Sequence, residues 1–248
     1  THHKILFRHR STGTEEIFWL NNRSDDPTSA GVSFRTTGKK PMRWNPIDGS
    51  VHEVSYEIKN GRTLIPLSFE PWDAFFIVFQ EPTDQLIQQL PEVKETVALT
   101  MDGTWTLDFA AEKVEFPTWT SWSDHSNPKI KYYSGTVTYS HTFTYSPAQN
   151  ERYVLDLGTV KNLAEIIVNG RNLGVLWKAP FRMDISEALK SGENKLEIKV
   201  VNLWVNRLIG DSQPGVEKTT FTTMPFYQPN SPLVPSGLLG PVVLIKQD

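Results

Sequence analysis

The sequence predicts an all-β protein made of two antiparallel β-sandwich domains. Three observations support this: short runs in which apolar and polar residues alternate, turn residues between those runs, and an aromatic content of 11%. At 248 residues the chain is long enough for two modest domains. We expect a small β-sandwich at residues 1–80, a linker at 81–95 and a larger sandwich at 96–248.

The first segment consists of short runs rich in aromatic and aliphatic residues. Turn residues separate these runs, as at Pro46–Gly49 and Asn60-Gly61. The expected strands are Ile5–His9, Glu15–Asn21, Val32–Arg35, Met42–Trp44, Tyr56–Ile58, Thr63–Phe69 and Ala74–Phe79. Strands of this length and spacing favour an antiparallel sandwich.

The stretch Glu81–Glu95 interrupts the β pattern. It is polar and is bounded by Pro82 and Pro91, as linkers often are. One short helical turn at Asp84–Leu90 would fit within it.

The second segment returns to β patterning. Gly135–Phe143 and Lys195–Val201 each alternate, which predicts strands with one buried face. Asn169-Gly170 suits a two-residue hairpin, because both residues tolerate positive φ. Ser186–Lys190 is expected to form one small surface helix. The long loops Glu112–Tyr133 and Asp211–Gly240 carry many aromatic residues; loops of this length are usually functional or pack against another domain.

Composition excludes several classes of function. The net charge of −3 gives no electrostatic reason to bind nucleic acid. No apolar run approaches the roughly 18 residues that cross a membrane, so we expect no membrane insertion. The absence of cysteine excludes disulfides and thiolate metal sites. The histidines show no metal-ligand spacing, and we expect no metal and no cofactor.

Several motifs point to one family. Ser121–Phe143, Leu155–Ile185, Val201–Asp211 (VNLWVNRLIGD) and Ser236–Pro241 resemble the C-terminal region of bacterial α-L-rhamnosidases of glycoside hydrolase family 106. Residues 1–80, with FWLNN and RWNPIDG, are similar to the small sandwich that precedes that region. Val154–Val201 resembles the sugar-binding sandwich of family 2 hydrolases, which implies a galactose-binding-like jelly roll for the second domain.

The resemblance implies a non-catalytic region of an α-L-rhamnosidase-like enzyme. In that family a large α/β barrel N-terminal to this region cleaves the substrate, and such a barrel needs about 250 residues of its own. The catalytic carboxylates therefore match no position here, and whether the chain is itself an enzyme stays open. The implied partners are that barrel and a carbohydrate, a plant-type rhamnose-containing glycan. The implied location is periplasmic or extracellular.

Two loop regions and one hairpin supply the candidate carbohydrate-binding residues. A flat aromatic ring with flanking hydrogen-bonding groups is typical of sugar sites. The candidates are Trp119, Trp122, Asp124, His125, Tyr132 and Tyr133 in the first loop, Trp177 after the hairpin, and Trp204, Asn206, Arg207 and Asp211 at the start of the second. The aromatic residues of the first loop could instead pack against another domain. Arg207 and Asp211 could instead form a buried pair in a structural corner.

Three functions thus remain open: an accessory region that binds carbohydrate, braces a barrel or does both, an autonomous carbohydrate-binding module, and a purely structural scaffold.

Overall fold

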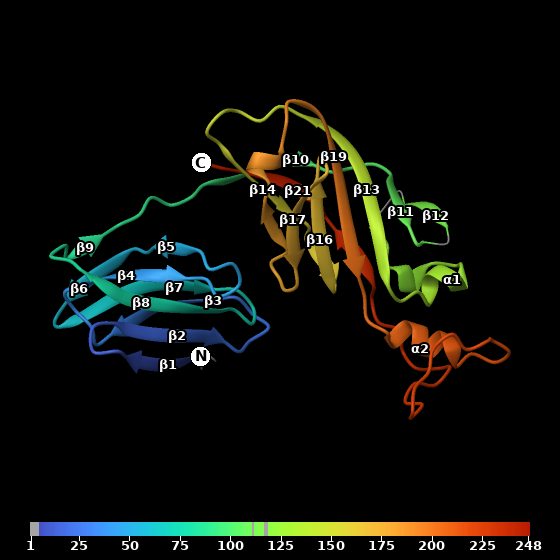
Figure 1. Cartoon of the computed structure of the whole chain (residues 1–248), viewed down its shortest axis with the longest axis horizontal. Helices are drawn as coiled ribbons and strands as arrows, with labels where there is room; N and C mark the ends of the chain where they lie inside the picture. The colour runs from blue at the N-terminus through green and yellow to red at the C-terminus, as the bar shows by residue number, and fades with distance from the viewer. Residues whose placement is uncertain (1–4, 111, 117–118) are drawn as a thin grey trace. The chain divides into compact units, whose positions relative to one another are not determined.

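The computed structural model describes residues 5–110, 112–116 and 119–248. The chain divides into two compact units, Thr1–Glu92 and Val93–Asp248, each built from antiparallel strands (Figure 1). The all-β prediction is therefore confirmed. Short 3₁₀ and α helices lie only at the ends and connections of strands in the described residues.

The first unit is a sandwich of two sheets. One sheet has the order β1-β2-β8-β4-β5 and the other the order β3-β7-β6-β9. The strands are β1 (Ile5–Ser11), β2 (Glu16–Asn22), β3 (Thr28–Phe34), β4 (Lys39–Trp44), β5 (Val51–Glu53), β6 (Tyr56–Lys59), β7 (Arg62–Phe69), β8 (Ala74–Pro82) and β9 (Ile87–Gln88). Alternate residues of β2, β7 and β8 point inward, and Phe18, Ile65, Ile77 and Phe79 form much of the shared core.

The stretch between the units differs in part from the expected linker. The division between residues 92 and 93 falls inside it. The expected helical turn at Asp84–Leu90 is wrong: β9 pairs there with β6, and the backbone N–H of Ile58 donates to the carbonyl of Leu86 at 2.6 Å. The reason is that β6 otherwise leaves one edge of its sheet without a partner.

The second unit is a larger sandwich around one core. Its sheets have the orders β10-β21-β14-β18 and β12-β11-β13-β19-β16-β17, with β15 and β20 forming a separate pair. The strands are β10 (Glu95–Thr100), β11 (Trp105–Asp108), β12 (Lys113–Phe116), β13 (Thr136–Tyr145), β14 (Arg152–Asp156), β15 (Thr159–Lys161), β16 (Leu163–Val168), β17 (Arg171–Leu176), β18 (Arg182–Asp184), β19 (Gly192–Val201), β20 (Gly237–Gly240) and β21 (Val243–Gln247). The helices are η1 (Trp122–Asp124), α1 (Pro128–Lys131), η2 (Ser186–Ala188) and α2 (Val205–Asp211).

The sequence patterns of this unit are reproduced closely. Leu196, Ile198 and Val200 of β19 are fully buried, as their alternation predicts. Asn169 and Gly170 have φ values of 52° and 82° and connect β16 to β17 as a tight hairpin. The small helix expected from Ser186 is the single 3₁₀ turn η2.

Candidate functional site

An open groove on the second unit brings two of the predicted residues together. Trp119 and Asp124 line it with residues from α1 and from the segment before β20. The full lining is Trp119, Ser121, Ser123, Asp124, Lys131, Leu233, Pro235 and Leu239, and the cavity volume is about 620 Å³. This volume lies within the range of about 300–1,000 Å³ that small-molecule sites occupy.

Trp119 is held firmly where it borders the groove. Its ring lies against the backbone of Gly240, where an added Cβ would approach the indole to 2.6 Å. Gly240 has a φ of +59°, so glycine suits this position on both counts. The Trp119 ring also packs against Trp105, with ring centroids 5.2 Å apart. A ring fixed in this way loses little conformational freedom when a ligand stacks on it.

Ser121 fixes the floor of the groove. Its hydroxyl oxygen accepts the backbone N–H groups of Ser123 at 3.3 Å and of Ser236 at 2.9 Å, which starts η1 and joins it to the chain before β20. The Ser121 and Ser123 hydroxyls lie 2.8 Å apart. The groove floor is therefore polar and already ordered.

Asp124 and Lys131 supply the charged groups. Asp124 is exposed at the end of η1, and Lys131 is the half-exposed last residue of α1. A carboxylate accepts hydrogen bonds and an ammonium donates them, so the groove offers both functions to sugar hydroxyls.

The buried position of Trp122 does not fit the prediction that this residue stacks on a sugar. Its side chain is fully buried, and its Nε1–H donates to the Tyr139 hydroxyl at 2.6 Å. Gly237 lies directly against this pair, because an added Cβ would lie 2.5 Å from the Trp122 Nε1 atom. The ring is enclosed by core residues on all sides, so it supports the groove from below instead of facing it.

The other predicted residues of the first loop also face protein. His125 stacks on Phe116, with ring centroids 5.6 Å apart. Tyr133 packs edge-on against Trp122, and burial raises the pKa of its hydroxyl. Tyr132 lies against Gly210 of α2, which places α1 beside α2. None of these three lines the groove.

The cluster at α2 is a structural corner that holds a long segment in place. We call that segment, residues 212–235 between α2 and β20, the arm; it has no strand or helix and projects from the sheets beyond α2 (Figure 1). Asn206 is fully buried and exchanges two hydrogen bonds with the backbone of Val234, as donor at 2.7 Å and acceptor at 2.9 Å. Its role in the structure is to satisfy backbone groups of the arm.

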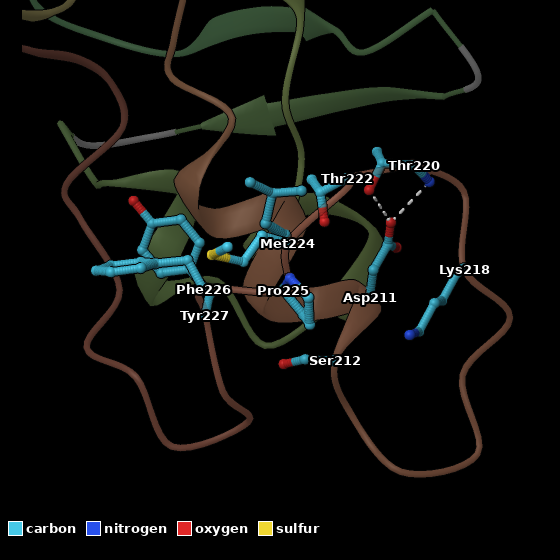
Figure 2. Close-up of a pocket in the computed structure, with 10 residues that line it drawn as sticks. Asp211, Ser212, Lys218, Thr220, Thr222, Met224, Pro225, Phe226 and Tyr227 are labelled. Atoms are coloured by element: carbon cyan, nitrogen blue, oxygen red, sulfur yellow. Dashed lines mark hydrogen bonds between the residues drawn. The ribbon is translucent and has the colours of Figure 1, made fainter.

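Asp211 holds the other side of the arm. It pairs with Arg207 one helical turn earlier, at 2.6 Å, and only 5% of its side chain is exposed. It also accepts the backbone N–H and hydroxyl of Thr220 at 2.8 and 2.5 Å (Figure 2). Burial alone would raise the pKa of Asp211, but the hydrogen bonds from Thr220 and Thr219 and the Arg207 charge outweigh it and hold the pKa below its ordinary value.

The hollow between α2 and the arm is small. Figure 2 shows Asp211, Lys218, Thr220, Met224 and Tyr227 around it, and its cavity volume is about 90 Å³. That is well below the range of small-molecule sites, so the groove is the better candidate for a sugar. Three apolar side chains of the arm are largely exposed, Phe221, Met224 and Phe226, by 86%, 78% and 80%.

Trp177 and Trp204 are exposed but lie apart from the groove lining. Trp177 follows β17 and is 57% exposed, and Trp204 precedes α2 and is 61% exposed. Sequence reasoning missed the other residues of the groove, which are Ser121, Ser123, Lys131, Leu233, Pro235 and Leu239. Only the length and the aromatic and Pro-rich character of the loops Glu112–Tyr133 and Asp211–Gly240 pointed toward these segments, without selecting any of these residues.

Comparison with known families identifies the second unit. Residues 88–227, more than half of the chain, match the family model described as the glycosyl hydrolase 2 galactose-binding domain-like domain. The chain belongs to this galactose-binding domain-like family. The jelly-roll fold inferred from Val154–Val201 is thereby confirmed. Residues 1–58 match the α-L-rhamnosidase model of glycoside hydrolase family 106, in agreement with the second resemblance.

Two longer proteins resemble this galactose-binding-like chain. A solved structure, "Structure of Rhamnosidase from Novosphingobium sp. PP1Y", superimposes with a TM-score of 0.94 at 40% identity, covering 99% of this chain and 24% of the rhamnosidase. A protein of Formosa agariphila named "Putative beta-glucuronidase" is 42% identical over 56% of this chain and 15% of its own length. The chain therefore spans a quarter or less of each relative.

Among residues 5–110, 112–116 and 119–248, no group of three or more His, Asp or Glu side chains is placed to hold a metal ion. In the same residues no helix is long and apolar enough to cross a membrane.

Proposed function

We propose that the chain is a non-catalytic region of an α-L-rhamnosidase-like glycoside hydrolase whose second unit binds carbohydrate in the groove at Trp119. The groove carries the proposal: a fixed indole borders a polar floor, with Asp124 and Lys131 at its sides. Stacking on a ring and hydrogen bonding to hydroxyls are the two contacts that a sugar offers. The proposed ligand is a rhamnose-containing plant glycan, and the family relationship supports that choice.

The carboxyl groups support a non-catalytic role. A glycosidase needs a general acid whose pKa is raised, next to a second carboxylate. Among the described residues, the carboxyl groups whose pKa departs clearly from the ordinary value are all shifted downward. They are Glu16, Asp48, Glu151, Glu165, Asp184 and Asp211. Carboxyl groups with a lowered pKa stay ionised near neutral pH and therefore have no proton to donate to a leaving group.

Calorimetric titration of the full chain with rhamnose-containing pectic oligosaccharides tests the binding. We expect saturable binding that Asp124→Ala weakens by about tenfold, the loss of one charge-assisted hydrogen bond. Trp177→Ala, an exposed Trp outside the groove, serves as the matched control and should bind unchanged. Equal affinity of Asp124→Ala, Lys131→Ala and the unmodified chain would remove the groove from the proposal. Release of reducing sugar by the chain alone would remove the non-catalytic assignment.

The arm favours bracing of another domain as a second function. Its apolar side chains at Phe221, Met224 and Phe226 are the most exposed large hydrophobic residues among the described ones, while hydrogen bonds to Asn206 and Asp211 fix both of its sides. Rigid, exposed apolar residues are typical of interface anchors. We propose that the arm packs against a catalytic domain of a longer polypeptide.

Sugar binding and thermal unfolding of the variant Phe221→Ser/Phe226→Ser separate the two roles of the arm. If the arm serves only for bracing, both the melting temperature and the glycan affinity of the isolated chain should change little, because both side chains are at least 80% exposed and Phe226 has one edge-on ring contact, with Tyr227. A loss of glycan affinity in this folded variant would assign the arm to the sugar site instead.

A further inference from the structure

The first unit contains a row of β1 side chains that faces the inside of the sandwich but is only partly covered. In the β1–β2 pairing, Ile5, Phe7 and His9 of β1 lie opposite Asn22, Leu20 and Phe18 of β2. Those three β2 residues are buried on the inner face of the sheet, so the β1 row points to the same side. Phe7 is nevertheless 65% exposed.

The cause of this exposure is a difference in width between the two sheets. β1 is the outer strand of its sheet, and β3 is the outer strand of the opposite one. Phe18 of β2 already packs edge-on against Phe34 of β3, with ring centroids 4.8 Å apart. Among the described residues no strand lies beyond β3 in its sheet, so no strand of that sheet faces β1.

A groove occupies the place of the missing strand. It has a cavity volume of about 550 Å³ and is lined by Ile5, Phe7, His9, Phe18, Leu20, Val32, Ser33, Phe34, Arg35 and Arg62. One side is the β1 row, and another is the outer edge of β3. In the described residues, β3 pairs only with β7 and its other edge has no strand partner, although the Ser33 carbonyl already accepts a hydrogen bond from Arg62.

The charged groups at the groove are mostly basic. Arg62 donates to the Ser33 hydroxyl at 2.6 Å and to the Ser33 carbonyl at 2.9 Å, so its charge lies at the end of β3. Arg35 follows β3 directly, is exposed and has no acidic partner in the described part of the chain. His9 stacks on Phe18 and contacts Glu16, which also accepts the Ser11 hydroxyl.

We propose that this groove binds an extended polypeptide segment that adds to β3 as a fifth strand and has alternating apolar and acidic residues. A strand on β3 directs every second side chain inward, under Ile5 and Phe7, where apolar residues fit. The intervening side chains point outward beside Ser33, near Arg35 and Arg62, where acidic residues fit. One extended segment could therefore pair with the edge of β3 and cover the β1 row at the same time.

Fluorescence anisotropy with a labelled seven-residue peptide, Glu-Val-Glu-Val-Glu-Val-Glu, tests the proposal on the full chain. The length matches the seven residues of β3. We expect saturable binding that weakens with added salt. A peptide with proline in place of the central valine should bind at least about tenfold more weakly, because proline has no N–H for the sheet and its ring opposes strand pairing. A peptide with lysine in place of glutamate should also bind more weakly.

Two neighbouring residues of β1 provide matched variants of the chain. Phe7→Ser removes the inward apolar contact and should weaken binding by about tenfold. Leu6→Ser changes a residue of similar exposure that points to the opposite face, and should leave binding unchanged. Both sites are exposed, so both variants should fold, which their melting temperatures would verify.

Three outcomes would overturn the proposal. They are failure of the valine–glutamate peptide to bind at millimolar concentration, equal binding to Phe7→Ser and the unmodified chain, and equal binding of the proline peptide. Concentration-dependent dimers that Phe7→Ser dissociates would assign the groove to a second copy of the chain, and would also contradict it.

Discussion

The carboxylate of Asp211 accepts the backbone N–H of Thr220 at 2.8 Å, across nine positions of a segment without regular secondary structure. With the Asn206–Val234 hydrogen bonds, this contact fixes the arm at two points. The arm then supplies Leu233 and Pro235 to the groove while it presents Phe221 and Phe226 to solvent. The proposed sugar site and the exposed apolar residues of the arm therefore depend on the same small set of buried polar contacts.

Asp211→Asn should release the arm. The amide keeps the size of the carboxylate but loses the charge that Arg207 and the Thr220 hydroxyl face, and we expect a loss of about 2 kcal/mol in the free energy of unfolding. Urea unfolding measures this loss, and hydrogen exchange should show faster exchange at Thr219 and Thr220. Asp124→Asn, an exposed carboxylate, is the control and should change stability by less than about 0.5 kcal/mol. Equal stability of the two variants would mean that Asp211 does not anchor the arm.

Gly237→Ala should destabilise the second unit more than a positive φ alone explains. Gly237 has a φ of +101°, and an added Cβ would lie 2.5 Å from the Trp122 Nε1 atom and 2.7 Å from the Tyr139 hydroxyl. We expect a loss of about 3 kcal/mol, from backbone strain together with overpacking. Gly215→Ala, at a φ of +76° with open space around it, should lose only about 1 kcal/mol. Thermal unfolding of both variants compares them, and equal losses would contradict the crowding.

The regular parts of the fold follow from the sequence because their signals are local. The alternation in Lys195–Val201 predicts which side chains are buried, and Asn169-Gly170 predicts where the chain turns. The helical turn expected at Asp84–Leu90 was a wrong prediction because the deciding contact is not local. Ile87 and Gln88 pair with the edge of β6, and the local sequence does not show that this edge lies nearby. Tertiary pairing outweighs a weak local preference.

The candidate site was harder to predict because it depends on which aromatic side chains are exposed to solvent. Trp119 and Trp122 lie three residues apart in the same loop, yet one borders the groove and the other is fully buried. Which of them faces solvent depends on Ser236, Gly237 and Gly240, more than a hundred residues later in the chain. Residue type identified both rings as possible sugar contacts, but only the packing distinguishes them.

Truncation of two tryptophans should show this difference directly. Trp122→Ala removes a fully buried indole and one of the two hydrogen bonds that the Tyr139 hydroxyl accepts, the other coming from the Leu238 N–H, so we expect a loss of about 3–5 kcal/mol or a failure to fold. Trp177→Ala removes a ring that is 57% exposed and should cost less than about 1 kcal/mol. Chemical unfolding monitored by circular dichroism measures both. A Trp122→Ala chain as stable as Trp177→Ala would contradict the buried position of Trp122.

Acid should weaken the anchoring of the arm through Asp211. The folded state holds the pKa of this carboxyl below its ordinary value, so the unfolded chain takes up a proton first as the pH falls. The stabilisation is therefore complete above the unfolded pKa, about 4, and is lost as the pH falls from there through the lower folded pKa. Asp184 and Glu165 shift in the same direction, so the unmodified chain alone does not isolate Asp211.

The difference in unfolding free energy between the unmodified chain and Asp211→Asn removes these shared contributions, because both proteins keep Asp184 and Glu165. We expect this difference to stay constant between about pH 5 and 7, above the unfolded pKa of the carboxyl, and to shrink below about pH 4. Arg207 remains charged throughout, so protonation of Asp211 is the event that removes the pair. Urea unfolding at closely spaced pH values measures the curve. A difference that does not change on acidification would show that Asp211 is not the titrating anchor.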